Sequence, residues 1–109
     1  MKTYNHYIND EWVEPSSGAY LDSENPFTGE IWARVARGNA KDAGLAVKAA
    51  KEAFENSDWA DMRPTQRGKL LVGLAEIIER EAVRLGEIEV RDNGKPVSYT
   101  HLTLPTIYS

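Results

Sequence analysis

The chain has 109 residues, of which 41% are hydrophobic and 28% charged, and its formal net charge is −4. These proportions are typical of a globular protein, and the acidic balance with scattered basic residues argues against nucleic acid or a membrane surface as partner. With no cysteine, the chain holds no disulfide, thiolate metal site or cysteine nucleophile. No apolar run has the length of a signal-peptide core or a membrane span, so we expect a cytoplasmic protein.

Residues 1–38 are predicted to form strands joined by turns. Asn9-Asp10 between two short apolar pairs predicts a hairpin, because Asn and Asp tolerate the left-handed backbone of a tight turn. Further turns are expected at 16–18 and at 25–29, where Pro and Gly favour a reversal of the chain. The alternating pattern over 30–37 predicts a strand with one face better buried than the other.

Residues 39–56 are predicted to form an amphipathic helix. Asn39 is a good N-cap, and Asp42 lies in the first turn, where the helix dipole favours negative charge. The apolar face consists mostly of small residues, which suits close packing on a sheet or a second helix. Trp59, just after the helix, is expected to fill a gap between helices.

A second helix is predicted to begin at Pro64, whose missing N–H costs nothing in the first turn of a helix. A third helical stretch is expected to end at Asn93-Gly94, with Pro96 just beyond. The second helix carries an apolar stripe that predicts burial: Leu70, Leu71, Leu74, Ile77 and Ile78.

No group of residues in the sequence forms a recognisable active site. His6 and His101 have no Cys, Asp or Glu neighbours at metal-ligand spacing and are expected on the surface. The three tryptophans are interpreted as separate packing anchors, with a shared aromatic ligand site as the alternative. Five acidic residues could pair for acid–base catalysis, but interleaved arginines favour a solvated, salt-bridged face: Glu76, Glu79, Glu81, Glu87 and Glu89.

Five motifs follow one another between residues 7 and 96. They are Tyr7-Ile8-Asn9-Asp10-Glu11-Trp12-Val13, Asn25-Pro26-Phe27-Thr28-Gly29-Glu30, the segment 46–54 with Trp59 after it, the segment 67–79, and Asp92-Asn93-Gly94-Lys95-Pro96. In this order and spacing they resemble the amino-terminal segment of the NAD(P)-dependent aldehyde dehydrogenase superfamily. The sequence departs from the family at Asp10, where the family usually has Gly.

The resemblance implies that residues 1–96 are the amino-terminal portion of the family's coenzyme-binding domain, around a Rossmann-like sheet supplied mostly by later sequence. The expected fold class is therefore α/β, with N-terminal strands and a hairpin followed by two to three amphipathic helices. The family's catalytic cysteine, glutamate and asparagine and its cofactor-ribose residues lie downstream of Pro96. No catalytic or cofactor-binding residue is therefore expected in this chain.

The resemblance also implies the activity of the parent protein. It would oxidise a small-molecule aldehyde to a carboxylic acid with NAD or NADP through a cysteine thioester, as a homodimer or homotetramer. The present chain would then be an incomplete piece, inactive and unable to bind the cofactor. The alternative interpretation is a small helical protein-interaction module without catalysis.

Some members of the family bind a structural Na⁺ or K⁺ ion. Their ligands include a backbone carbonyl just before the Asn-Pro turn and the aspartate of the Asp-Asn-Gly-Lys motif, which correspond here to Glu24 and Asp92. Oxygen ligands suit a hard cation. The alternative for Asp92 is a side chain near a helix C-terminus without a ligand, and a third ligand would come from sequence not present.

Residues 97–109 differ in character from the rest of the chain. An acidic stretch that continues the helix would follow Lys95-Pro96 in the family, but residues 97–106 resemble the translation of a transposon-end adapter used in sequencing libraries. We therefore expect 97–109 to be a non-native tail that contributes nothing to the core, and exclude it from the fold. The alternative is a natural, β-prone C-terminus.

Overall fold

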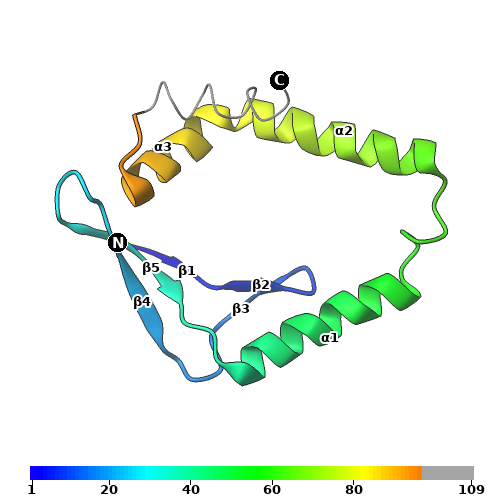
Figure 1. The fold of residues 1–109 in the computed structure, drawn as a ribbon, viewed down its shortest axis with the longest axis horizontal. Helices are drawn as coiled ribbons and strands as arrows, with labels where there is room; N and C mark the ends of the chain where they lie inside the picture. Colours follow the sequence, from blue (N-terminus) through cyan, green and yellow to red (C-terminus); the bar gives the residue numbers. More distant parts are fainter. Residues whose placement is uncertain (97–109) are drawn as a thin grey trace.

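The computed structural model describes residues 1–96, which form five short strands followed by three helices (Figure 1). The strands are β1 (Lys2–Tyr4), β2 (His6–Ile8), β3 (Glu11–Val13), β4 (Tyr20–Glu24) and β5 (Ile31–Ala36). The helices are α1 (Ala40–Asn56), α2 (Pro64–Arg80) and α3 (Ala82–Asn93). The predicted α/β class and order of elements are confirmed. The predicted non-native tail, with His101, lies outside the described residues.

The strands form two separate units. β1, β5 and β4 make a mixed sheet in that order, in which β5 runs parallel to β1 and antiparallel to β4. β2 and β3 form the predicted antiparallel hairpin. Its turn is made by Asn9 and Asp10, whose φ angles of 55° and 63° lie in the left-handed region that these two residue types tolerate.

The start of α1 is fixed by a reciprocal pair of hydrogen bonds. The Asp42 backbone N–H donates to Asn39 Oδ1 at 3.0 Å, and the Asn39 backbone N–H donates to Asp42 Oδ2 at 3.2 Å. This is a capping box in which Asp42 takes the place usually held by Glu or Gln, so two N–H groups that the helix leaves unpaired are satisfied.

The second and third helices follow each other with a single break. Pro64 opens α2 as predicted. Glu81, with φ −96° and ψ 8°, interrupts the helical path between α2 and α3. Gly94 ends α3 with φ 77° and donates its N–H to the Val90 carbonyl at 2.8 Å, which is the expected glycine stop. None of the helices within residues 1–96 is long and apolar enough to cross a bilayer.

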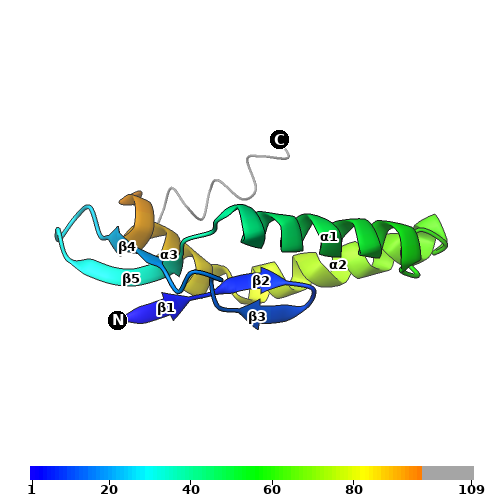
Figure 2. The same ribbon diagram turned by 90° about the horizontal axis from the view of Figure 1, so that it is seen from below.

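The elements bury little apolar surface against one another. Figure 1 shows α1 and α2 on different sides of an open frame, and Figure 2 shows that this frame is thin. The radius of gyration is 17.2 Å, whereas a compact domain of this size has about 13 Å. Among the described apolar residues only Ala33 is fully buried, and Phe54 on α1 is 80% exposed. Every residue of the predicted α2 stripe is exposed as well.

The prediction for Trp59 is wrong. Trp59 was expected to fill a gap between helices but is 43% exposed, because α1 and α2 diverge at the turn that carries it. On β5, Ala33 is buried, but Ile31 and Val35 on the same face are exposed, so neither face of the strand is uniformly buried. Trp32, on the opposite face, is instead half-buried with its ring centroid 6.1 Å from that of Tyr4.

We predict that the isolated chain melts over a broad temperature range or aggregates, because its apolar helix faces stay in contact with water. Differential scanning calorimetry combined with sedimentation velocity would measure both properties. A sharp, cooperative transition in a monomeric sample would contradict this expectation. It would show that the chain is an independent domain and would favour the interaction-module interpretation.

Candidate functional site

Two motifs that are distant in sequence meet in the structure. The first is the Asn-Pro turn, in which the Asn25 carbonyl accepts the Gly29 N–H at 2.8 Å and Asn25 Oδ1 accepts the Phe27 N–H at 2.9 Å. The second is the end of α3. The Ser23 hydroxyl, just before the turn, donates a hydrogen bond to the Asp92 carboxylate. We call this meeting of residues 23–29 and 91–95 the turn–helix junction.

Gly94 allows the two parts of the junction to approach. Its φ of 77° lies in the left-handed region, which glycine adopts far more readily than most residues with a side chain. A Cβ at this position would also lie 2.8 Å from Pro26 Cγ, which is closer than real contacts allow. The glycine is therefore required both by the helix stop and by the proline ring that packs over it.

A cation–π contact joins α3 to the sheet beside the junction. The Arg91 guanidinium carbon lies 5.7 Å from the centroid of the Trp32 ring. Trp32 thus acts as the predicted packing anchor, while its buried Nε1 has no hydrogen-bond partner among residues 1–96. Trp12 contacts Tyr7 at 4.9 Å between ring centroids but is 68% exposed. Within residues 1–96 the ring contacts of Trp12 and Trp32 are with tyrosines, and none joins two tryptophans.

The predicted cation ligands come from the two sides of the junction. Glu24 directly follows Ser23, and the Ser23–Asp92 hydrogen bond holds the end of β4 against the end of α3. The available donors are oxygen atoms, which suit a hard cation. However, no cluster of three or more acidic or histidine side chains occurs within residues 1–96.

A second polar centre lies at the N-terminus of α1, around Asp42. Its side chain is 5% exposed. Besides capping α1, its Oδ1 accepts the backbone N–H of Ser16 at 3.1 Å. The Ser16 hydroxyl donates to Asn39 Oδ1 at 3.0 Å, so the loop before β4 is tied to the start of the helix. The capping pattern was visible in the sequence, but the partner 26 residues earlier was not.

The environment of Asp42 favours its ionised form. Burial by itself raises the pKa of this carboxyl, but the backbone N–H groups of Asn39 and Ser16 outweigh that effect. The Ser16 hydroxyl and the nearby His6 add to it, so the pKa lies below its usual range. The carboxylate therefore stabilises the fold above about pH 4 and loses this contribution as the pH falls through its depressed pKa.

His6 was expected on the surface, and this prediction is wrong. Its side chain is 20% exposed, and its Nε2 lies 3.5 Å from Asp42 Oδ2. The Nε2 atom is buried and makes no hydrogen bond within the described part of the chain. The contact arises because β2 packs against α1, which the sequence pattern did not show.

The acidic residues of α2 and α3 include several ion pairs, as predicted for a salt-bridged face. Arg84 Nε lies 2.8 Å from Glu81 Oε2, and its hydrogen bond is the main reason why the pKa of Glu81 is lowered. Arg91 pairs with Glu87 at 4.0 Å. These carboxylates are paired with cations rather than with each other, so acid–base catalysis has no support here.

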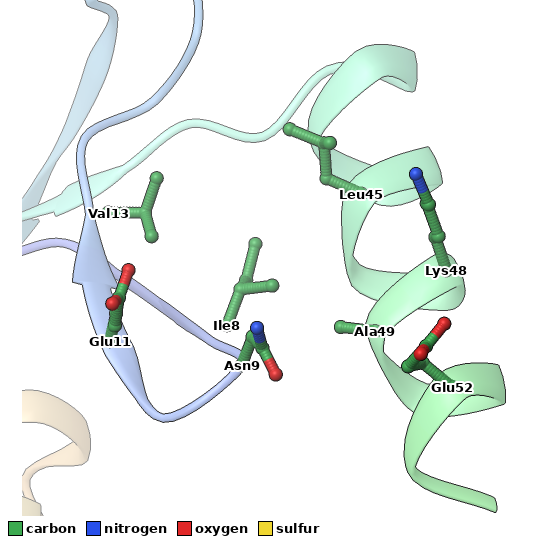
Figure 3. A pocket seen from close by; sticks show the side chains of 8 residues that line it. All are labelled: Ile8, Asn9, Glu11, Val13, Leu45, Lys48, Ala49 and Glu52. Carbon is green, nitrogen blue, oxygen red and sulfur yellow. The ribbon is translucent and has the colours of Figure 1, made fainter. Parts of the chain in front are cut away.

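An apolar groove of about 430 Å³ lies between the hairpin and α1 (Figure 3). Ile8 and Val13 on the hairpin face Leu45 and Ala49 on the helix, with charged side chains such as Glu52 beside them. The lining has no cysteine, histidine or hydroxyl side chain, and its ionisable groups are Glu11, Lys48 and Glu52.

Comparisons with known proteins show to which family the chain belongs. The family model described as "Aldehyde dehydrogenase family" matches residues 12–108. This chain belongs to the aldehyde dehydrogenase family. The chain is 43% identical over 97 residues to the mitochondrial aldehyde dehydrogenase of Rattus norvegicus. It is 39% identical over 94 residues to the putative aldehyde dehydrogenase DhaS of Bacillus subtilis (strain 168).

The structural comparison agrees with the family assignment. The NAD⁺ complex of an aldehyde dehydrogenase from Bacillus cereus superposes with a TM-score of 0.85 and 36% sequence identity, over 88% of this chain and 20% of that protein. The two relatives above are matched over 88% and 86% of this chain but only 19% of their own length. The chain thus spans about a fifth of these aldehyde dehydrogenases.

We predict that Gly94→Ala destabilises the junction by at least about 1 kcal/mol, because alanine meets both an unfavourable backbone angle and the Pro26 ring. The matched control is Gly68→Ala in α2, where a Cβ meets no neighbour. This substitution should stabilise the helix by about 0.5–1 kcal/mol, because glycine is the poorer helix former. Amide hydrogen exchange at the end of α3 and in α2 would measure both, because it reports local stability without a cooperative melt. Equal changes in protection for the two variants would show that the junction does not form.

Proposed function

We propose that this chain is the amino-terminal part of an NAD(P)-dependent aldehyde dehydrogenase that converts an aldehyde to a carboxylic acid. The observation that carries the proposal is the family match over residues 12–108 together with the likeness to the Bacillus cereus NAD⁺ complex. In this reaction the aldehyde carbon loses hydride to the nicotinamide, and water supplies the second oxygen of the acid. A cysteine thioester as the intermediate is part of the proposal.

The chemistry would be supplied by sequence beyond this chain. The chain has no cysteine and so cannot supply the thiolate that the proposed thioester requires. We propose that residues 1–96 serve as the outer portion of the coenzyme-binding domain. That 97–109 are non-native is a separate proposal, and the family match as far as residue 108 speaks against it. A homodimeric or homotetrameric state and a cytoplasmic location are further proposals. The mitochondrial enzyme among the relatives is a reason to test the location directly.

We further propose that the Glu24 backbone carbonyl and the Asp92 carboxylate contribute to a site for Na⁺ or K⁺ in the complete protein. The support is the Ser23–Asp92 hydrogen bond, which places the two segments side by side. The remaining ligands would come from other parts of the protein. Such an ion would stabilise the fold by linking the sheet to α3, with no part in the chemistry.

For the reaction, we predict that the 109-residue chain reduces neither NAD nor NADP with any aldehyde. The reading frame completed from genomic DNA beyond the codon for Pro96 should encode a cysteine and a glutamate in the family's motifs. Its product should form NADH or NADPH with some aldehyde, followed by absorbance. Replacing that cysteine by alanine is the control. A completed frame without the cysteine, or one that stops near Pro96, would refute the proposal.

For the cation, we predict that potassium chloride raises the melting temperature of the completed protein above that in choline chloride of equal ionic strength. Asp92→Asn should remove most of this difference, because it removes a charged oxygen ligand. Asp58→Asn, on the exposed loop after α1, should keep it. Equal melting temperatures of the unchanged protein in potassium, sodium and choline salts would rule the site out.

A further inference from the structure

Within residues 1–96, no element covers the apolar stripe of α2. Leu74 and Ile77, in the middle of this stripe, are 52% and 48% exposed. The element that mainly contacts α2 is α3, which follows it directly in the chain. α1 carries a second such stripe, in which Val47 is 68% and Phe54 80% exposed. Contiguous exposed apolar faces are typical of surfaces that bind another polypeptide.

The comparison with a complete enzyme indicates which polypeptide covers these faces. The frame superposes with a TM-score of 0.85 on an aldehyde dehydrogenase chain of which it spans 20%. The open shape is therefore kept inside a much longer polypeptide, whose remaining part is available to cover the stripes. A second copy of this chain is the alternative occupant. It does not account for the same shape within one longer chain, and a net charge of −4 on each copy opposes self-association.

We propose that this chain, as a separate polypeptide, binds the downstream portion of the parent aldehyde dehydrogenase without a covalent link and completes its fold. The α2 stripe is a principal contact. The inference rests on the function proposed above, and the partner is the polypeptide that follows Pro96 in the complete reading frame. The partner's contact surface is apolar, because it removes leucine and isoleucine side chains from water.

The place of the separation leaves the elements of this chain intact. α3 ends at Gly94, and Lys95 and Pro96 lie in an exposed segment after it. A break in such a segment is tolerated because it cuts no helix or strand. The peptide link itself supplies an effective concentration, on the order of millimolar for a short flexible linker, and no side-chain contact. Contacts between the two parts therefore suffice to hold them together as separate chains.

Binding does not require that this chain is folded beforehand. Its apolar faces become buried as its segments become ordered, so association and folding occur together. The apolar burial offsets the conformational entropy that is lost on ordering, an offset that the isolated chain does not have. Production of both polypeptides in the same cell lets the partner bind before the free chain aggregates.

Leu74 and Val72 allow the stripe to be tested against a matched control. Both lie in α2, and their exposed fractions in this chain are similar, at 52% and 59%. Two residues correspond to a rotation of about 200° around a helix, so Val72 lies on the side opposite Leu74. The isolated chain should therefore tolerate aspartate equally well at either position. A partner that covers the stripe distinguishes the two substitutions, because it would bury the charge of Leu74→Asp.

The test coexpresses the tagged 109-residue chain with the separate downstream polypeptide. The two should copurify and reduce NAD or NADP with the aldehyde that the intact completed protein oxidises, whereas the downstream polypeptide alone should be inactive. Leu74→Asp should lower both the copurified amount and the recovered activity at least about tenfold, because burial of one leucine side chain is worth more than a tenfold step in affinity. Val72→Asp should keep both.

Failure of this inference and failure of the proposed function give different results. An active intact protein whose two separate polypeptides do not copurify would overturn the inference and leave the proposed function standing. A downstream polypeptide that is active alone, equal losses with Leu74→Asp and Val72→Asp, or a tagged chain that recovers only an untagged copy of itself would also overturn it. An inactive intact protein would refute the proposed function, and with it the partner named here.

Discussion

Apolar side chains stabilise a fold only when another surface covers them, and this chain supplies too little of that surface. α1 and α2 each carry an amphipathic stripe, but they diverge, and the small sheet contacts neither along its length. Phe54 and Leu74 remain in water, and Ala33 alone among the described apolar residues is fully buried. At about 25 cal/mol for each Å² of apolar surface removed from water, such unburied stripes contribute little to stability.

In place of an apolar core, polar contacts between distant segments give the frame its shape. Asp42 connects the loop at Ser16 with the start of α1, and Asp92 connects β4 with the end of α3. Each contact closes a long stretch of chain, and few other interactions offset the conformational entropy that this closure costs. The arrangement fits a portion of a larger protein, whose remaining surfaces would hold the same segments in place.

Most of the local structure could be predicted from the sequence because its causes are local. Asn9-Asp10 makes the hairpin turn, Asn39 caps α1, and Gly94 stops α3, and each depends on the residue's own conformational or capping preference. Burial could not be predicted in the same way. A periodic apolar stripe shows which face of a helix will be covered, but not whether the covering surface lies within the same chain.

The candidate sites likewise depend on contacts between distant segments, which the local sequence does not reveal. Glu24 and Asp92 could be selected only through the family resemblance, because no spacing rule joins positions so far apart in the chain. The sequence neighbours of His6 carry no ligand pattern, and Asp42 is recognisable in the sequence only as a residue of the first helical turn. Their contact depends on the packing of β2 on α1, a tertiary relation that places a titratable ring beside a buried carboxylate. The chemical character of such a histidine is therefore a property of the fold, and similar sequences that dock the hairpin differently need not share it.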